Sequence, residues 1–510
     1  MLSTASLMLH ARVQADAAPV NSIELVHAAL RAAMPVAPGT PDLTAAFVSD
    51  SVAAMSGPDT GEVIVIGAGL SGLTAASRLR AAGVAVRVLE ARERVGGRTL
   101  TVPFAQEPVD LGGQWVGPTQ DRVLALAREL GVETFPQYLQ GRKVLEFDGE
   151  RRSYKGLLPR IPALALVELG LTIWRIERMA RQVPLGRPES AARAAEFDGQ
   201  SVAEWLARHV KRRPARAMLE IATHAIFARE PATISFLYFL HYTHSGGSFT
   251  RLAEVRDGAQ ALRLRGGVQQ LSVRLAEPLG AALRLATPVV AIEQDGAGVT
   301  VRTAAGEALR AGRVIVAVPP AVARDIAFAP ALPELRQVVH EQMPMGSVVK
   351  CVIAYPRAFW REQGLSGEAV SNAGLLRMVF DDSSHDGRLA ALVGFVIGDA
   401  VAGFAALAPA ARRAAVLEAL CRFFGPAAAT PSDYVDHDWT AEQWSRGCYV
   451  GVMPPGVLTR VGAALRAPCG RIYFAGTETA TRWVGYLDGA IEAGERAADE
   501  VLATREVGRV

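Results

Sequence analysis

Short apolar runs separated by glycine and proline predict most of the regular elements of this chain. The clearest pattern begins near residue 62, where the uninterrupted apolar run Val63–Ile66 predicts a buried strand. The stretch Leu70–Ala82 has helical character and ends at Gly83, and Val84–Leu89 predicts a second buried strand. A strand, a helix and a second strand in this order form a βαβ unit, the building block of a parallel sheet.

Helices are more frequent before Gly266, and short β-rich runs are more frequent after it. Helices are expected within 157–240 and, with closer bounds, over Gln120–Leu130, Ser201–Val210, Pro214–Phe227, Val268–Leu279 and Gly489–Leu502. Strands are expected over Leu283–Ile292, Val299–Thr303, Arg313–Val318 and Arg471–Phe474, and strands of another sheet over Ser347–Tyr355, Leu375–Phe380 and Leu389–Ile397. This order predicts a nucleotide-binding domain built from separated segments, with a mixed sheet-and-helix domain inserted between them.

Two further stretches bear on membrane contact and order. Residues 1–60 are rich in Ala, Pro and Ser and predict a partly ordered extension, with one short helix capped at Asn21–Glu24 and running to Ala33. The longest apolar stretch, Leu157–Trp174, contains two prolines, an arginine and a glutamate. A membrane span needs about 20 apolar residues, so this stretch predicts a core or surface helix and no transmembrane segment.

Composition excludes several classes of function. The chain has 510 residues, enough for two to four domains or for one cofactor domain with large insertions. Its formal net charge is only +3 and no basic run stands out, which argues against nucleic-acid binding. Its four cysteines show no CxxC spacing, so we expect a reduced, cytoplasmic protein without a disulfide framework.

A dinucleotide-binding motif follows the first predicted strand. Gly67, Gly69 and Gly72 form the G-x-G-x-x-G pattern at the start of the predicted helix, and Glu90 ends the next strand. The three glycines allow a tight turn, a close approach of the pyrophosphate and close packing of helix on strand, while Glu90 accepts hydrogen bonds from a ribose. The motif alone does not separate FAD from NAD, and an ordinary glycine-rich turn is the alternative.

Basic residues lie shortly after Glu90. Arg92 and Arg98 flank Gly96 and Gly97. A guanidinium is suited to a bidentate phosphate contact, so Arg98 could reach back to the pyrophosphate. A surface arginine is the alternative.

Taken together, the motifs resemble those of the flavin-dependent monoamine oxidase family. The resemblance runs from Glu62 to about Leu502 and rests on Val63–Thr99, Asp110–Gln120, Gly346–Lys350, Gly447–Tyr449, Pro454–Gly456 and Arg471–Arg496. It implies an α/β fold with a Rossmann-like (GR2-type) FAD-binding domain and an inserted α+β substrate domain, as in monoamine and polyamine oxidases. The implied FAD-binding segments are 61–130, 249–335 and 442–503, and the implied substrate-binding segments are 131–248 and 336–441.

The resemblance implies FAD as the cofactor. The Val289 backbone would contact the adenine, Gly476 to Glu478 would lie along the ribityl chain and pyrophosphate, and the last helix would point its N-terminus at the flavin ring. The full set of expected FAD contacts is Gly67, Gly69, Ser71, Gly72, Glu90, Arg92, Gly97, Arg98, Gly113, Gln114, Trp115, Val289, Trp439, Cys448, Gly476, Thr477, Glu478, Tyr486 and Leu487.

Three residues are the expected catalytic group. The resemblance implies that Lys350 is linked through a water to flavin N5, and that the facing rings of Tyr449 and Tyr486 form a slot for the amine. From the sequence alone, a snorkelling lysine and two core tyrosines are the alternatives. The expected substrate pocket consists of His244, Phe380, Tyr449 and Tyr486.

Two expectations concern single side chains near the flavin. Cys448 matches the position of a thioether link to the flavin in the animal enzymes, although some bacterial and fungal relatives bind FAD without a covalent bond; a structural cysteine is the alternative. His244 and His241 lie three residues apart without a third ligand, so they do not predict a metal site.

The reaction implied is oxidation of an amine to an imine, with a hydride equivalent passing to the flavin and O2 reduced to hydrogen peroxide. Ala369–Phe380 contains no acidic residue to hold a distal ammonium, which favours a monoamine with an apolar or aromatic body. The alternatives are a dehydrogenase with another electron acceptor, a polyamine or L-amino-acid oxidase, a non-catalytic flavin-binding scaffold and, more distantly, an NAD enzyme. The expected assembly is a homodimer.

Overall fold

The computed structural model describes residues 61–156 and 159–507. The expected extension over residues 1–60, with its short helix, lies outside the described residues, as do Leu157 and Leu158. Within them, no helix is long and apolar enough to cross a membrane.

The nucleotide-binding motif lies in a five-stranded parallel sheet whose strand order is β10-β2-β1-β14-β21. Its strands come from distant parts of the chain: β1 (Glu62–Ile66), β2 (Ala85–Leu89), β10 (Leu283–Arg284), β14 (Arg313–Val316) and β21 (Ile472–Phe474). The predicted first strand, helix and second strand therefore form as expected, with helix α3 (Leu70–Ala81) between β1 and β2. Parallel pairing brings the carboxyl ends of these strands to one edge, where a nucleotide binds in such sheets.

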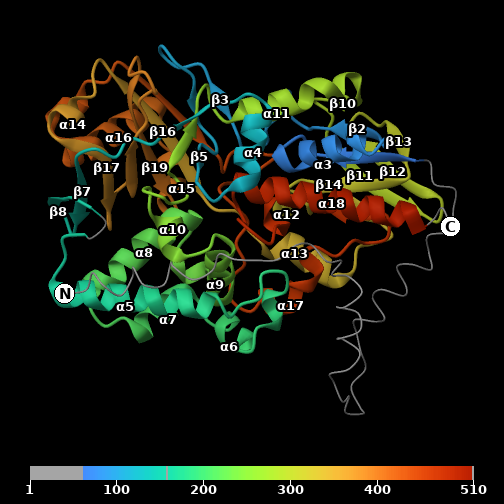
Figure 1. The fold of residues 1–510 in the computed structure, drawn as a ribbon, viewed down its shortest axis with the longest axis horizontal. Helices are drawn as coiled ribbons and strands as arrows, with labels where there is room; N and C mark the ends of the chain where they lie inside the picture. The colour runs from blue at the N-terminus through green and yellow to red at the C-terminus, as the bar shows by residue number, and fades with distance from the viewer. Residues whose placement is uncertain (1–60, 157–158, 508–510) are drawn as a thin grey trace, which may run out of the picture. The chain divides into compact units, whose positions relative to one another are not determined.

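One face of this sheet is covered by α3 and by the last helix, α18 (Leu487–Val507), which lie side by side (Figure 1). The two helices approach closely at Gly494, because glycine has no side chain. A Cβ atom added there would lie only 2.3 Å from the carbonyl oxygen of Ser71. The other face packs against a four-stranded sheet of order β13-β12-β11-β15. The strands of that sheet are β11 (Val289–Asp295), β12 (Gly298–Thr303), β13 (Ala308–Ala311) and β15 (Ala327–Ala329).

Two predicted elements in this region have different bounds in the structure. The single strand expected over Leu283–Ile292 is two strands, β10 and β11, in two different sheets. Ala286 is left-handed, with φ of 47°, and Pro288 has no N–H to donate, so the chain turns between the sheets there. The helix expected over Val268–Leu279 ends at Ala276, and a separate 3-10 helix, Glu277–Ala282, follows with Pro278 in its first turn.

A seven-stranded sheet of order β20-β16-β19-β18-β17-β7-β8 forms the second major layer. Its strands are β7 (Arg142–Phe147), β8 (Glu150–Tyr154), β16 (Val348–Tyr355), β17 (Leu365–Ser371), β18 (Met378–Asp381), β19 (Ala390–Ile397) and β20 (Asp433–Asp438). Every residue of β16 and β19 is buried, which is typical of central strands covered on both faces. The hairpin β7-β8 joins this sheet through parallel pairing of β7 with β17, more than two hundred residues away in the chain.

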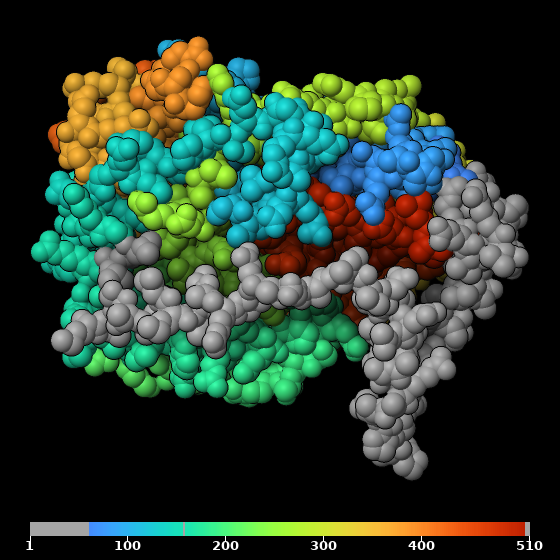
Figure 2. All heavy atoms as spheres, viewed as in Figure 1, coloured from blue at the N-terminus to red at the C-terminus, as the bar shows by residue number. Residues whose placement is uncertain are grey.

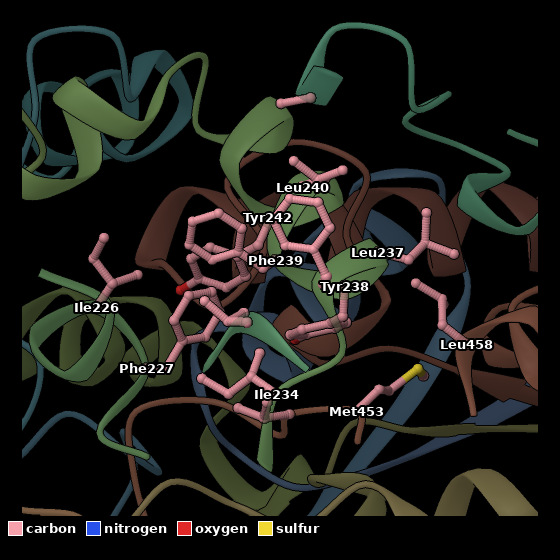
Figure 3. Packing of buried hydrophobic residues seen from close by; sticks show 14 of the residues in the cluster. Ile226, Phe227, Ile234, Leu237, Tyr238, Phe239, Leu240, Tyr242, Met453 and Leu458 are labelled. Atoms are coloured by element: carbon pink, nitrogen blue, oxygen red, sulfur yellow. The ribbon is translucent and has the colours of Figure 1, made fainter. Parts of the chain in front are cut away.

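Helices form a separate core below these sheets. Tyr238 and Tyr242 of α9 (Phe236–Ser245) pack with Phe227 of α8 (Arg213–Phe227), as Figure 3 shows, and the Phe227 and Tyr242 ring centroids are 4.6 Å apart. Ser201 and Glu204 form a reciprocal capping box that begins α7, so the expected helix starts where the sequence indicates. The helices of this region are α5 (Ala163–Ala180), α6 (Ala194–Asp198), α7 (Val202–His209), α8 (Arg213–Phe227), α9 (Phe236–Ser245) and α10 (Phe249–Ala253).

The predicted apolar stretch after residue 157 contains α5, a surface helix. Leu164, Leu171 and Trp174 are all more than half exposed on it. The segment that contains α5 to α8 is visible at the surface in green tones (Figure 2).

Short elements connect the layers and position the site. A three-stranded sheet joins β5 (Trp115–Val116), β6 (Thr134–Pro136) and β9 (Leu262–Leu264), and a two-stranded ladder joins β3 (Thr101–Val102) and β4 (Val109–Asp110). The remaining α-helices are α4 (Asp121–Glu129), α11 (Gln269–Ala276), α12 (Pro320–Ala323), α13 (Glu334–Gln342), α14 (Phe359–Glu362), α15 (Ala400–Ala405), α16 (Pro409–Phe424) and α17 (Leu458–Val461).

Candidate active site

The glycine turn between β1 and α3 has the geometry that a bound pyrophosphate requires. Gly67 has φ of +102°, and a Cβ atom at Gly72 would lie 2.0 Å from the carbonyl oxygen of Gly67. Gly69 faces Gly97 with no side chain between the two backbones. The turn is thus a bare backbone surface at the start of a helix, which suits an anion.

Glu90 lies at the end of β2, next to this turn. Its buried carboxylate accepts hydrogen bonds from the backbone N–H of Ala68 at 2.7 Å and of Arg92 at 3.0 Å. A carboxylate has about four acceptor positions, so Glu90 keeps capacity for a ribose hydroxyl. Together with the bare turn, this arrangement fits the adenosine and pyrophosphate parts of a dinucleotide.

A single cavity extends from the glycine turn to the predicted catalytic residues. Its nucleotide end is lined by Gly67, Gly69, Ser71, Glu90, Arg92, Gly97, Arg98, Val289, Gly476 and Thr477. Its other end is lined by Gly113, Gln114, Trp115, Lys350, Phe380, Trp439, Cys448, Tyr449, Tyr486 and Leu487. The structure therefore brings together residues that the sequence separates by more than four hundred positions.

Arg98 links three distant segments at this cavity. It donates two hydrogen bonds to the Glu478 carboxylate, at 2.6 and 3.0 Å, and one to the Tyr449 carbonyl oxygen at 2.9 Å. Burial alone would lower the pKa of Arg98, but the Glu478 carboxylate outweighs that effect and raises it. Glu478 itself is outside the cavity lining, so it reaches the cavity through Arg98.

Lys350 on β16 is held at the wall of the cavity. Its side chain is buried, and its Nζ donates to the Gly112 carbonyl oxygen at 3.1 Å and to Gln114 Oε1 at 2.5 Å. Burial lowers the pKa of Lys350 to about 8, against the opposing effect of the Asp382 and Asp110 carboxylates. An amine with this pKa exchanges protons near neutral pH.

Tyr449 and Tyr486 line the same end of the cavity as Lys350. Burial raises the pKa of both phenols, so both stay protonated. Phe395 packs edge-on against Tyr449, and Tyr242 lies 6.0 Å from Tyr486 between ring centroids. These contacts form an aromatic, apolar wall around the place where a substrate would lie.

Cys448 and Trp439 also lie in the lining. The Trp439 indole donates to the Leu111 carbonyl oxygen at 2.8 Å, which fixes its ring. Burial raises the pKa of the Cys448 thiol to about 12. The thioether link between Cys448 and the flavin stays a prediction.

Some expected residues are not in the cavity lining. Gly72 lies beneath the turn, and His244 donates through Nδ1 to the Val183 carbonyl oxygen, 2.8 Å away. The residue of α9 that lines the cavity is Tyr242. The only signal for Tyr242 in the sequence is that it is a large aromatic residue two positions before His244.

The buried charges behind Lys350 were not predicted. Gln114 Nε2 donates to the Asp382 carboxylate, which forms an ion pair with Arg263 at 2.8 Å. Asp110 accepts hydrogen bonds from Thr101 and from the backbone of Val268. Asp110 begins one of the stretches that carry the family resemblance, but no local pattern marks Asp382 or Arg263, which join Gln114 only in the folded chain.

The sequence profile described as "Flavin containing amine oxidoreductase" matches residues 70–502. The chain belongs to this family. Like its relatives, it is an oxidoreductase of amines that uses FAD, so the predicted family, fold class, enzyme class and cofactor are confirmed. The bounds of the two predicted domains and the roles of single residues stay predictions.

The similarity extends over most of the chain in each comparison. A protein of Dictyostelium discoideum named "Probable flavin-containing monoamine oxidase A" is 39% identical, covering 86% of this chain and 97% of its own length. Wild-type putrescine oxidase with bound putrescine superposes with a TM-score of 0.84 at 34% identity, over 87% of this chain and 99% of its own. Cyclohexylamine oxidase from Brevibacterium oxydans superposes with a TM-score of 0.83 at 35% identity, over 88% of this chain and 100% of its own.

Proposed function

We propose that this amine oxidase acts on a monoamine with an apolar or aromatic body and uses O2 as its electron acceptor. The observation that carries the proposal is that buried Lys350 and the rings of Tyr449 and Tyr486 line one cavity with the glycine turn. The balanced reaction converts a primary amine, O2 and water to an aldehyde or ketone, ammonia and hydrogen peroxide.

The chain's own residues bind, orient and exchange protons. Bound FAD would supply the redox chemistry, accepting a hydride equivalent from the carbon beside the amine nitrogen and passing two electrons to O2. The bare turn at Gly67, the Glu90 carboxylate and Arg98 would hold the dinucleotide. Lys350 would hold a proton at Nζ and donate it as O2 is reduced.

The aromatic wall would also select the protonation state of the substrate. An alkylamine in water has a pKa close to that of lysine, about 10.4, and is mostly cationic at neutral pH. Burial between Tyr449, Tyr486 and Phe395 disfavours the cation. The neutral amine has the free lone pair that oxidation requires.

The charges in the lining favour a monoamine over a diamine. The carboxylates among the lining residues are Glu90 and Asp325. Glu90 accepts from the backbone at the nucleotide end, and Asp325 pairs with Arg446. Neither is placed to hold the distal ammonium of a diamine, although one structural neighbour is a putrescine oxidase.

The same lining argues against an amino-acid substrate. Its two arginines, Arg92 and Arg98, are each engaged by a glutamate, Glu442 and Glu478 respectively. A substrate carboxylate would therefore lack a free guanidinium to pair with. The neighbour that fits this cavity better is cyclohexylamine oxidase, whose named substrate is a monoamine with an apolar ring.

The test is peroxide release by the purified protein with a matched panel of monoamines, diamines and L-amino acids. We expect turnover with monoamines such as cyclohexylamine and benzylamine. Activity confined to diamines or amino acids would refute the charge argument. Slow reoxidation of the reduced flavin by air would instead favour a dehydrogenase with another acceptor.

Three finer points are part of the proposal. The Cys448 link is tested by denaturing and filtering the protein, since a covalent flavin stays with the polypeptide. A homodimer is tested by sedimentation equilibrium, and a cytoplasmic location by cell fractionation.

A further inference from the structure

A chain of buried polar groups leads away from Lys350 through Gln114, which also lines the cavity. Lys350 Nζ donates to Gln114 Oε1 at 2.5 Å, and Gln114 Nε2 donates to an oxygen of Asp382. Arg263 pairs with the same oxygen at 2.8 Å and donates to the Ser383 carbonyl oxygen at 2.8 Å. The chain thus links four elements or their ends: β16, β5, β18 and β9.

All four groups are shielded from water. Lys350 and Gln114 are each 2% exposed, Asp382 is 0% exposed and Arg263 is 8% exposed. Removing an ion pair from water costs several kcal/mol per charge, so a buried pair is weak as a stabilising device. Its connection to the lysine through Gln114 indicates a role at the site.

The chemistry of the groups fixes the direction of every hydrogen bond. An ionised carboxylate only accepts, so the Gln114 amide must turn its NH2 toward Asp382. Its carbonyl oxygen must then face Lys350, whose ammonium only donates. If Asp382 were neutral and able to donate, the Gln114 amide could reverse and turn its NH2 toward the lysine.

We propose that Asp382, held by Arg263, is a positioning residue that fixes the Gln114 amide and through it holds Lys350 at the wall of the cavity. Two of the three N–H groups of the ammonium are then taken by Gln114 and by the Gly112 carbonyl oxygen. The third has no acceptor among the residues that the structure describes. The significance of this arrangement for catalysis rests on the proposed amine oxidation.

The carboxylate also acts on Lys350 by its charge. The charged or titratable groups that act on Lys350 are the carboxylates of Asp382 and Asp110, the guanidinium of Arg263 and the thiol of Cys448. Burial lowers the pKa of Lys350, and Asp382 is the strongest of the groups that oppose this effect. Loss of the Asp382 charge removes the main counterion and leaves Arg263 as an uncompensated cation.

The composition of the chain makes a direct measurement possible. The chain has only four lysines, at positions 143, 155, 211 and 350. Lysine labelled with 15N at Nζ in the holoenzyme therefore gives few side-chain signals, and Lys350→Met assigns the signal of Lys350. Titrating that signal reports its pKa without turnover.

The decisive variant is Asp382→Asn, and its matched control is Asp381→Asn. Asp381 is also buried and also pairs with an arginine, Arg361, at 2.7 Å, but it has no hydrogen bond to Gln114. We expect D382N to lower the pKa of Lys350 by about one unit or more, and D381N to leave it within a few tenths. An unchanged Lys350 titration in D382N would overturn the proposal.

A second variant covers the case in which D382N does not fold. Gln114→Met leaves the Asp382–Arg263 pair in place and removes the link to Lys350. We expect Q114M to lower the pKa of Lys350. We also expect the pKa shift in the Q114M/D382N double variant to be smaller than the sum of the two single-variant shifts. An unchanged pKa in Q114M, or fully additive shifts, would count against the link.

Failure of this proposal is separate from failure of the proposed function. If no amine is oxidised but D382N shifts the Lys350 titration, the positioning network stands and the assigned reaction is wrong. If monoamines are oxidised and neither variant shifts the titration, the reaction stands and the network is refuted.

Discussion

A single lysine determines much of the chemistry that this site can perform. The family resemblance indicates Lys350 as a candidate, whereas its place at the end of an apolar run favours a snorkelling surface lysine. The structure puts it on a central strand between β19 and β20, with its Nζ bound to Gly112 and Gln114. Burial on both faces of the sheet, not the local sequence, determines its properties.

Replacing this lysine should affect O2 reduction more than cofactor binding. In Lys350→Met we expect the reoxidation of reduced flavin by O2 to slow by about 100-fold or more, the usual range for a positioned proton donor. Stopped-flow absorbance after anaerobic reduction measures it. Lys155→Met is the control, because Lys155 is exposed and outside the cavity lining. Equal reoxidation rates in K350M and wild type would contradict the role.

The same group predicts a pH dependence. Because burial lowers the pKa of Lys350 to about 8, its ammonium form is lost as the pH rises through that value. We expect the reoxidation rate to fall with half-effect near pH 8 in the wild type, and this inflection to be absent in K350M. Stopped-flow rates between pH 6 and 10 measure it. An inflection retained in K350M would assign it to another group.

The lowered pKa of Lys350 also predicts how the unfolding free energy changes with pH. The folded state binds its Lys350 proton more weakly than the unfolded chain, whose lysines titrate near 10.4. The unfolding free energy of the wild type relative to K350M should therefore rise between pH 8 and about 10.4. Denaturant titrations at several pH values test the sign, and a difference that falls with pH would contradict it.

At the level of elements, the predictions succeeded where local pattern and folded environment agree. β1, α3 and β2 are marked by an apolar run, three glycines at fixed spacing and a helix stop, all within thirty residues. The hairpin β7-β8 was not predicted, although the Asp148-Gly149 turn between its strands is a local hairpin signal. Its pairing with β17 has no local signal, because β17 lies far along the chain. Asp382 and Arg263 were missed for the same reason: only tertiary contact makes them neighbours.

The turn between β1 and α3 gives a prediction at this scale. In Gly72→Ala the new Cβ atom would lie 2.0 Å from the Gly67 carbonyl oxygen, so α3 must move away from the turn. We expect loss of bound FAD, measured as the flavin-to-protein absorbance ratio after gel filtration. Gly170→Ala on α5 is the control, since its Cβ atom would meet nothing within 4 Å and the change favours a helix. Normal flavin content in G72A would contradict this packing.

At the level of the whole molecule, the site exists only because distant segments meet. Arg98 follows the first βαβ unit, Tyr449 precedes the last strand and Glu478 follows it, and all three join in one set of hydrogen bonds. The resemblance to a family indicated which segments belong together, since no pattern in the residues themselves does so. The geometry of their meeting, with Glu478 reaching the cavity only through Arg98, required the structure.

The junction formed by Arg98, Tyr449 and Glu478 should contribute to the unfolding free energy of the whole molecule. In Glu478→Gln the partly buried Arg98 loses its counterion, and removing one partner of a buried pair costs about 3–5 kcal/mol. We expect a lower unfolding free energy and weaker flavin retention, measured by denaturant titration. Glu293→Gln is the control, because its pair with Arg302 is exposed and should contribute little. The Arg98 guanidinium also lowers the pKa of Glu478 in spite of burial, so the wild-type advantage should disappear as the pH falls through that pKa. Equal stability of E478Q and wild type at pH 7 would show that the junction contributes no net stability.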